Sequence, residues 1–549
     1  MEIVAQNVKD SRVFIQSSVL IHSIDIANTA SLAVFAETIA QKGDRIPFDD
    51  NLFLNPVESE QSFSGSPALA GASGYNKSRQ HYMESPTLTL SAPAAPARKG
   101  LVLLIAIIAA LGGLLFGYDT GIIGVALLGL GREFALNDTL KQLVTGAIIF
   151  GALFGCLGTG PISDRLGRRR TIILVGIVFA LGSILSAVSP NVTLLILSRF
   201  LLGLSAGSST QIIPVYIAEV APPQHRGKLV VLFQFMVVSG ITVAYFTGFA
   251  LDEHWRWMFA LGVVPAVILL AGMSVLPESP RWLLSRGREQ DALAVLERVR
   301  GDEAAARREL TEIKTVSDAP EGTWRDLLQP WVRPALLVGA CISMFSQITG
   351  NNALVYYAPT ILTQAGFSDQ TAVLATGCST ILVVIMTVIG SLLVDRIGRR
   401  RYLLILIPGS IIALAIMGYL FQGAGPTTDV QRWLVVGCLA AYLMFNCGGF
   451  GVCIWLINSE VYPLFVRGKG ASVGAFSHWF FDLVVTLTTL SLVTWLGAAH
   501  TFWVYAGISL LALVFIWRFV PETRGKSLEK IEHELREHRF YPYQQRHDH

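Results

Sequence analysis

Two residues of opposite charge lie inside long apolar stretches of the sequence. Asp119 lies ten residues before Gly129, near the end of the stretch 101–130, and Arg199 lies a few residues into the stretch 192–219. If both stretches are helices, the two residues lie ~15 Å and ~10 Å from the same end, a difference that an arginine side chain can bridge. Arg199 would favour the ionised form of Asp119, and desolvation would favour its protonated form. The pair could therefore take up and release a proton, and the alternative is a permanent structural ion pair.

A second pair of ionisable residues, His478 and Asp482, lies in the apolar stretch 470–497. The two positions are four residues apart, so that they share one face of a helix. They could bind a hydroxyl group of a ligand, assist the proton, or simply satisfy each other, and the sequence leaves these three roles open.

Three charged motifs occur twice, in the same order. The first members are Gly160-x-x-x-Asp164-Arg165-x-Gly167-Arg168-Arg169-Arg170, Glu219-x-x-Pro222-x-x-x-Arg226-Gly227-Lys228 and Pro277-Glu278-Ser279. They return, with one added residue before the Asp, as Gly390…Asp395-Arg396-x-Gly398-Arg399-Arg400-Arg401, Glu460-x-x-Pro463-x-x-x-Arg467-Gly468-Lys469 and Pro521-Glu522-Thr523. One unit has therefore been used twice in the same orientation, which is typical of transporters.

The repeated motifs also predict a charge network at one end of each half. The members in the first half are Asp164, Arg168, Glu219 and Arg226, and those in the second half are Asp395, Arg399, Glu460 and Arg467. Gly167 and Gly398 would allow the tight turns that bring these residues together. The alternative is a set of solvated surface ion pairs, which contribute ~0–1 kcal/mol each.

The elements that must position these residues are apolar runs, for which ~20 residues suffice to cross a bilayer. The sequence contains twelve, at 101–130, 142–163, 171–189, 192–219, 229–251, 257–276, 333–364, 370–394, 402–423, 432–461, 470–497 and 501–520. None alternates strictly between apolar and polar residues, as the strands of a membrane barrel do. The predicted fold is an all-α integral membrane protein with twelve transmembrane helices in two six-helix halves.

The composition agrees with this prediction and excludes other classes. Hydrophobic residues make up 52% of the 549 residues and charged residues only 15%, whereas soluble proteins are about 25% charged. The formal net charge of +3 is too balanced to indicate a nucleic-acid partner. The six cysteines lie in apolar stretches without metal-type spacing, and no nucleophile–base arrangement or nucleotide loop is present. We expect no enzyme activity, no cofactor and no metal.

Basic residues predict the orientation, because cytoplasmic loops are enriched in Lys and Arg. They gather in the short loops after the second, fourth, eighth and tenth spans, so both termini should be cytoplasmic and the chain should cross the cell membrane (plasma or inner) many times. The expected organisation is a disordered leader (1–99), a six-helix bundle (100–276), a cytoplasmic helical linker (277–332), a second bundle (333–520) and a cytoplasmic tail (521–549). Met83 is an alternative start, which would make the leader an over-extension of the gene.

Several motifs resemble those of the sugar porter branch of the major facilitator superfamily. They are Phe116-Gly117-Tyr118-Asp119, Asp164-Arg165-x-Gly167-Arg168-Arg169, Pro214-x-Tyr216-x-x-Glu219, Pro277-Glu278-Ser279-Pro280-Arg281-Trp282, Gln347-x-x-Gly350, Asn352-x-x-x-Tyr356-Tyr357 and Pro521-Glu522-Thr523. The resemblance covers about residues 100–530 and implies import of a sugar or polyol by proton symport, with the two bundles rocking around a central site. It also implies that Asp119 accepts the proton, tuned by Arg199, and that the repeated charge networks lock the outward-open state.

The resemblance further implies a substrate site of amides and aromatic rings. Its members are Gln234, Gln347, Asn352, Tyr356, Trp455, His478 and Trp479. Gln347 and Asn352 are five residues apart, so a bent or broken helix is needed to aim both inward, and Gly350 permits one. The chain departs from the family pattern at Ser346, Val383, Val452, His478 and Asp482, which leaves the exact sugar or polyol open.

Three other functions remain as alternatives. The first is a passive sugar facilitator, against which Asp119 argues, because facilitators of the family typically have a neutral residue there. The second is a carrier of organic acids, which would need cations facing the cavity, where only Arg199 is a candidate. The third is a nutrient sensor, which would usually have a longer tail. The expected partners are the substrate, the proton and the lipid bilayer, and we expect the chain to act as a monomer.

Overall fold

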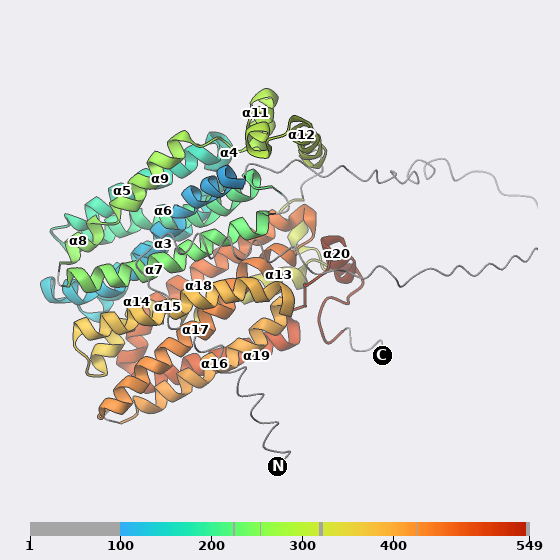
Figure 1. Ribbon diagram of the computed structural model, residues 1–549. Helices are drawn as coiled ribbons and strands as arrows, with labels where there is room; N and C mark the ends of the chain where they lie inside the picture. The colour runs from blue at the N-terminus through green and yellow to red at the C-terminus, as the bar shows by residue number, and fades with distance from the viewer. Residues whose placement is uncertain (1–98, 223–224, 253, 318–321, 424, 545–549) are drawn as a thin grey trace, which may run out of the picture. The chain divides into compact units, whose positions relative to one another are not determined.

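The computed structural model describes residues 99–222, 225–252, 254–317, 322–423 and 425–544, which are almost entirely helical (Figure 1). The first half consists of α3 (Lys99–Glu133), α4 (Asp138–Leu166), α5 (Arg168–Ala187), α6 (Val192–Val220), α7 (Arg226–Leu251), α8 (Trp255–Ala260) and α9 (Val263–Val275). The second half consists of α13 (Arg333–Ile348), α14 (Asn351–Gln364), α15 (Asp369–Ile397), α16 (Arg399–Leu420), α17 (Asp429–Glu460), the short turn η3 (Leu464–Val466), α18 (Arg467–Leu496) and α19 (Ala498–Phe519). Apart from its last residue, the expected leader lies outside the described residues.

Each of the twelve expected spans is helical. Within the described part of the chain, eleven helices are long and apolar enough to cross a membrane, and α8 with α9 forms one of these spans. The remaining expected span, the seventh (333–364), is divided into α13 and α14, and each piece is shorter than the ~20 residues that a bilayer requires. The prediction of a broken helix around Gly350 is therefore confirmed.

Small residues allow close packing within the first half, where α3 packs against α7 and α4 against α6. A Cβ atom on Gly117 of α3 would lie 1.8 Å from the carbonyl oxygen of Val237, and one on Gly203 of α6 would lie 2.0 Å from that of Ile148. Helices in membranes associate through such backbone approaches, because lipid gives little hydrophobic driving force. Gly117, in the Phe116–Asp119 motif, thus allows α3, the helix that bears Asp119, to pack directly against the backbone of α7.

Shorter helices connect and follow the two halves. The connection contains α10 (Pro280–Ser285), α11 (Glu289–Arg300), α12 (Glu303–Ser317) and the turn η2 (Asp326–Leu328), and the tail contains α20 (Leu528–Arg536). Arg300 ties the connection to α6, because its Nη1 donates to the carbonyl of Val220 at 2.9 Å and its Nε pairs with Glu309 at 2.6 Å. In the tail, the guanidinium of Arg536 lies 3.9 Å from the ring centre of Trp331.

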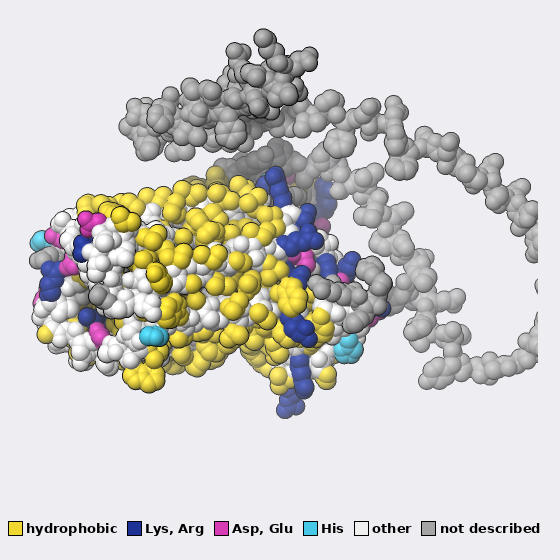
Figure 2. All heavy atoms as spheres, turned by 90° about the horizontal axis from the view of Figure 1, so that it is seen from below, with side chains coloured by type: hydrophobic (Ala, Val, Ile, Leu, Met, Phe, Trp, Pro, Cys, Tyr) yellow, Lys and Arg dark blue, Asp and Glu magenta, His cyan; other side chains and the backbone are white. Residues whose placement is uncertain are grey.

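We call the end of the bundle where α4 meets α5, and α15 meets α16, the basic end, because the Arg-rich motifs lie there. In Figure 2 a broad hydrophobic band covers the side of the molecule, and Lys and Arg side chains gather beyond one edge of it. The exposed large hydrophobic side chains include Leu181 and Ile184 of α5, Leu392 of α15 and Leu511 of α19. Such a band is expected of a surface that faces lipid.

The two halves pack through three helix pairs, namely α4 with α18, α7 with α15 and α3 with α14. The polar contacts between them include several at the end opposite to the basic end. Arg132 of α3 forms an ion pair with Asp369 of α15, and the hydroxyl of Thr494 donates to Asp138 at 3.0 Å. The hydroxyl of Tyr245 donates to the carbonyl oxygen of Val355. The halves are thus tied together at the end opposite to the Arg-rich motifs.

Candidate functional site

Asp119 and Arg199 form an ion pair in the interior of the first half. The side chain of Asp119 is 3% exposed and that of Arg199 is fully buried. The guanidinium also lies 5.5 Å from the ring centre of Phe259. Oδ2 of Asp119 and Nε and Nη2 of Arg199 have no hydrogen-bond partner among the described residues. The pair is therefore incompletely satisfied, and one carboxylate oxygen is available to a proton or a water molecule.

A cluster of polar and aromatic side chains surrounds His478 in the second half. Nε2 of Gln347 donates to Nδ1 of His478 at 3.1 Å. The ring centre of His478 lies 5.3 Å from that of Trp455 and 5.5 Å from that of Trp479. Within the described chain, Oε1 of Gln347 and Nε1 of Trp479 are buried without a partner. One free acceptor and one free donor beside aromatic faces suit a ligand that has hydroxyl groups on an apolar ring.

Residues of the first half also lie beside this cluster. Phe116, three residues before Asp119, makes an edge contact with Trp479 at 5.5 Å between ring centres. A Cβ atom on Gly451 of α17 would lie 3.8 Å from Nε2 of Gln234, so that this amide faces the helix that bears Trp455. The polar cluster of the second half and the helix of the buried ion pair are therefore neighbours.

Asn352 and Tyr356 occupy consecutive turns of α14, beyond the helix break. Asn352 donates through Nδ2 to the carboxyl of Asp482 at 2.7 Å. Tyr356 is 2% exposed, and its phenol interacts electrostatically with Asp482, Asp119 and Arg199. The structure thus brings all seven residues of the expected substrate site into one region, with Tyr356 at its buried edge.

The helix break between α13 and α14 lies at Gly350, whose φ is 92°. Two side chains of α17 satisfy Thr349 beside the break, because the hydroxyl of Tyr442 donates to its carbonyl oxygen at 2.9 Å and Nδ2 of Asn446 donates to its Oγ1 at 3.2 Å. Broken helices inside a membrane require such partners for the freed backbone groups. Tyr442 and Asn446 were not expected from the sequence, although their spacing of four in an apolar run could have indicated them.

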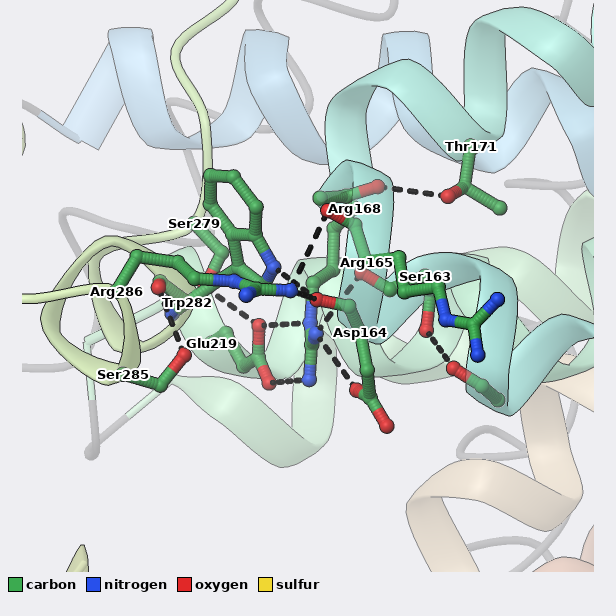
Figure 3. A network of polar contacts seen from close by, with 12 residues as sticks. Ser163, Asp164, Arg165, Arg168, Thr171, Glu219, Ser279, Trp282, Ser285 and Arg286 are labelled. Atoms are coloured by element: carbon green, nitrogen blue, oxygen red, sulfur yellow. Dashed lines mark hydrogen bonds and ion pairs between the residues drawn. The ribbon is translucent and has the colours of Figure 1, made fainter.

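At the basic end of the first half, Arg168 joins Asp164 to Glu219 (Figure 3). Its Nε and Nη2 lie 3.0 Å and 3.3 Å from the two carboxylate oxygens of Glu219, and its Nη1 lies 3.1 Å from Oδ1 of Asp164. Ser279 donates its hydroxyl to the same Glu219, and Nε1 of Trp282 donates to the carbonyl of Asp164 at 2.8 Å. The paired contact with Glu219 holds the ends of α5 and α6 together.

The second half repeats this network. Nη2 of Arg399 lies 2.8 Å from Glu460 and 2.9 Å from Asp395, and the hydroxyl of Thr523 donates to Glu460 at 2.6 Å. Arg226 and Arg467, expected as the fourth members, form no ion pair within 4 Å among the described residues, although Arg226 lies near Glu219 and Arg467 near Glu460.

Glu278 and Glu522 bind helix N-termini, a role that was not expected from the sequence. Oε1 of Glu278 accepts hydrogen bonds from the backbone N–H groups of Arg168 and Arg169, at 2.9 Å and 3.0 Å. Oε1 of Glu522 accepts from the N–H of Arg399 at 2.9 Å. A carboxylate at a helix N-terminus satisfies free donors and the helix dipole. The repeated Pro-Glu-Ser/Thr motif therefore fastens the connection to the first half and the tail to the second half.

No group of three or more His, Cys, Asp or Glu side chains that could hold a metal ion occurs in the part of the chain that the structure describes. The six cysteines are unpaired. The polar groups at the centre are suited to a neutral, hydroxyl-rich ligand and a proton.

A duplicated bundle of membrane-spanning helices, with polar and ionisable groups between its halves, defines a membrane transporter. Residues 105–535 match the family described as "Sugar (and other) transporter". The chain belongs to this family, the sugar porters of the major facilitator superfamily, and is a multi-pass membrane protein.

Relatives and solved structures agree with this assignment. The chain is 38% identical to the glucose transporter GlcP of Staphylococcus epidermidis, over 79% of this chain and 97% of the relative. It is 36% identical to the major myo-inositol transporter IolT of Bacillus subtilis, over 79% and 94%. Its fold is similar to that of the Escherichia coli proton:xylose symporter XylE bound to 6-bromo-6-deoxy-D-glucose, with a TM-score of 0.67, 27% identity and coverage of 79% and 99%.

Proposed function

We propose that this protein imports a sugar or polyol together with a proton by alternating access. The observation that carries the proposal is the buried Asp119–Arg199 ion pair with an unpartnered carboxylate oxygen, on the helix whose Phe116 contacts Trp479. The similarity to a proton:xylose symporter, a glucose transporter and a myo-inositol transporter supports both the substrate class and the coupling. In this proposal Asp119 carries the proton and Arg199 favours its release.

We propose that the substrate binds to the seven residues around His478. The amides Gln234, Gln347 and Asn352 would bind hydroxyl groups, and the rings of Trp455 and Trp479 would pack on the apolar C–H faces of the ligand. The free acceptor of Gln347 and the free donor of Trp479 support this assignment, because buried polar groups usually have partners.

We propose that the two charge networks at the basic end are gates. Arg168 with Asp164 and Glu219, and Arg399 with Asp395 and Glu460, would keep the helix ends of each half in place, and Arg226 and Arg467 would join their networks when the basic end closes. The contacts between the halves at the opposite end support an arrangement in which that end is closed. States that differ by a few kcal/mol suffice for such a cycle.

We also propose that the basic end is cytoplasmic, as the Arg-rich loops favour, and that both termini lie on that side of the cell membrane. The chain would work as a monomer, with the substrate, the proton and the bilayer as its partners and without catalytic activity or a nucleic-acid partner. The connection 277–332 and the tail 521–549 would be cytoplasmic, since α10, α11, α12 and α20 follow the charge networks.

Uptake by purified protein in liposomes tests the proposed function. The panel consists of radiolabelled D-glucose, D-xylose, D-galactose and myo-inositol, with and without an imposed proton gradient, acid outside. We expect at least one of them to accumulate above its external concentration with the gradient, and only to equilibrate after a protonophore is added. If the compounds only equilibrate across the membrane, with or without the gradient, the protein is a passive facilitator. Uptake of an organic acid and of none of the four compounds would overturn the proposal.

A further inference from the structure

Asp482 is a completely buried carboxyl group on α18, in the middle of a membrane-spanning helix. Its Oδ2 accepts a hydrogen bond from Nδ2 of Asn352 at 2.7 Å, and its Oδ1 accepts one from the hydroxyl of Thr486 at 3.4 Å. Both donors are neutral. No ion pair among the described residues includes Asp482.

This surrounding differs from that of Asp119, the other buried acid. Asp119 is neutralised by Arg199, whereas Asp482 has only an amide and a hydroxyl as partners. An ionised carboxylate that is buried without a counter-charge is costly, and such groups usually bind a proton instead. These neutral surroundings therefore favour the uptake of a proton by Asp482, although both of its oxygens accept hydrogen bonds in the arrangement that the structure shows.

The titratable and charged groups around Asp482 supply no free cation. Tyr356 and Tyr357 of α14 interact electrostatically with it, and Tyr505 of α19 and Asp138 of α4 interact with the same Tyr357. Across the interface, Asp119 and Arg199 interact with Tyr356, but Arg199 is bound to Asp119. The side chains that α13 and α17 direct at this region, Ser346, Gln347 and Trp455, carry no charge.

His478, one turn earlier on α18, is also uncharged in its contact with Gln347. Its Nδ1 accepts a hydrogen bond from Nε2 of Gln347 at 3.1 Å, which requires a neutral imidazole. The two titratable residues of α18 thus each contact one amide of the broken helix. His478 contacts Gln347 before the break, and Asp482 contacts Asn352 after it.

We propose that Asp482 is a second proton-binding site, in the second half, and that its proton decides which end of the Asn352 amide faces the substrate. As a carboxylate, Asp482 accepts from Nδ2 of Asn352, and the amide oxygen points away from it toward Asn351, 3.1 Å from that residue's Nδ2. When a proton from water binds to the carboxylate, the acid O–H donates to Oδ1 of Asn352, and the amide turns over. Asn352 then presents a donor to Asn351 where it had presented an acceptor, so the hydrogen bond between the two residues is broken and both Nδ2 groups are free to donate to the substrate.

The sign of the effect follows from burial. A substrate that fills the site removes water near Asp482, which favours the protonated form. Protonation and substrate binding therefore support each other, so affinity falls as the pH rises. A single linked proton changes the affinity by up to about tenfold per pH unit. This proposal rests on the proposed function for the identity of the ligand, and the proton site itself can be tested without any ligand.

Infrared spectroscopy of the purified full-length protein, titrated with pH, tests the proton site directly. We expect a carboxylic acid C=O band that grows as the pH is lowered, that is lost in Asp482→Asn and that remains in Asp119→Asn. Thr486→Val is the matched control, because it removes the longer of the two hydrogen bonds to the same carboxyl and should keep the band. A band that is unchanged in Asp482→Asn would overturn the proposal.

Exchange of radiolabelled D-glucose, with equal pH on both sides of the liposome, tests the link to Asn352. We expect the wild-type KM to rise up to about tenfold per pH unit, and that of Asn352→Ala to be independent of pH although its infrared band persists. If Asp482→Asn does not fold, the pH dependence of the wild-type KM and its loss in Asn352→Ala still test the proposal. A wild-type KM that is independent of pH, or a pH dependence that survives in Asn352→Ala, would overturn the role of Asn352. An infrared band without exchange of any of the four panel compounds would contradict the proposed function and leave the proton site standing.

Discussion

The two buried acids of this protein differ in what neutralises each of them. Asp119 has a guanidinium partner within its own half, whereas Asp482 has neutral partners from the broken helix. An acid beside a permanent cation releases its proton readily, and one beside neutral groups retains it. We expect the two carboxyls to be protonated at different points of one transport cycle, and both interact electrostatically with Tyr356.

At this scale we predict that Asp119→Asn abolishes proton-driven accumulation but keeps counterflow exchange. Asparagine has nearly the shape of aspartate and cannot take up a proton, so the binding site and the moving parts remain while the coupling is lost. The measurement is sugar accumulation in liposomes under an imposed proton gradient, beside counterflow without a gradient.

Glu133→Gln is the matched control for this variant. Glu133 lies on the same helix and also pairs with an arginine, Arg256 at 2.7 Å, but its side chain is 41% exposed. We expect this variant to accumulate substrate like the wild type. Uphill accumulation by Asp119→Asn would show that the proton is carried by another residue.

At the scale of single elements, the broken helix α13–α14 places the largest number of site residues. Gln347 lies in the last turn of α13, and Asn352 and Tyr356 lie in the first two turns of α14. An unbroken helix would rotate residues five positions apart by about 500°, so that they would not face the same point. The break allows both amides to contact α18, and the side chains of α17 hold it in place.

We predict that Gly350→Ala lowers both transport and thermal stability. The φ of 92° is unfavourable for a residue with a side chain, which costs about 1–3 kcal/mol. The new Cβ would also lie 3.0 Å from the ring of Tyr505. The measurements are the unfolding temperature of the purified protein and its uptake rate.

Gly437→Ala in α17 is the control, because its Cβ would meet no atom within 4 Å. Alanine favours a helix over glycine by roughly 0.5–1 kcal/mol, so this variant should be at least as stable as the wild type. If Gly350→Ala matched it in both measurements, the break would not depend on the backbone of Gly350.

At the scale of the whole described bundle, contacts between the two halves at the end opposite to the basic end influence whether that end is open or closed. Arg132 with Asp369, and Asp138 with Thr494, hold that end together. The ion pairs of the two charge networks join residues within one half. Opening the opposite end therefore breaks contacts between halves, while the networks can stay within their own halves.

We predict that Asp369→Asn shifts the population toward states that are open at the end opposite to the Arg-rich motifs. Both side chains are exposed, so the ion pair contributes ~0–1 kcal/mol, and the ratio of the two states should change by at most about fivefold. Pulsed electron paramagnetic resonance between labels on Val188→Cys and Trp495→Cys, both exposed at that end, measures the shift in a background without the native cysteines.

Glu303→Gln is the control for this prediction, because it removes an exposed ion pair of 2.7 Å within α12 that joins no two halves. The distance distribution should be that of the wild type. An Asp369→Asn distribution that matches the control would indicate that the Arg132–Asp369 pair does not bias the cycle.

The sequence alone predicted all twelve spans, their duplication and the break near Gly350. These follow from local properties: the length of apolar runs, the repetition of motifs and the conformational freedom of one glycine. The ion pair of Asp119 with Arg199 could also be anticipated, because depth along a helix follows from residue number. Contacts from other helices, such as those of Tyr442 and Asn446 to Thr349, depend on how helices rotate about their axes, which residue number does not determine.

The sequence by itself determined the elements, their order across the membrane and the membership in a transporter family. Only the tertiary structure decided which partner each ionisable group has. His478 and Asp482 share a helix face and could have bonded to each other, yet each contacts an amide of the broken helix, while Arg226 and Arg467 have no ion-pair partner within the described residues. The physical reason is that hydrophobicity and turn chemistry act along the chain, whereas the neutralisation of a buried charge depends on which helices pack around it.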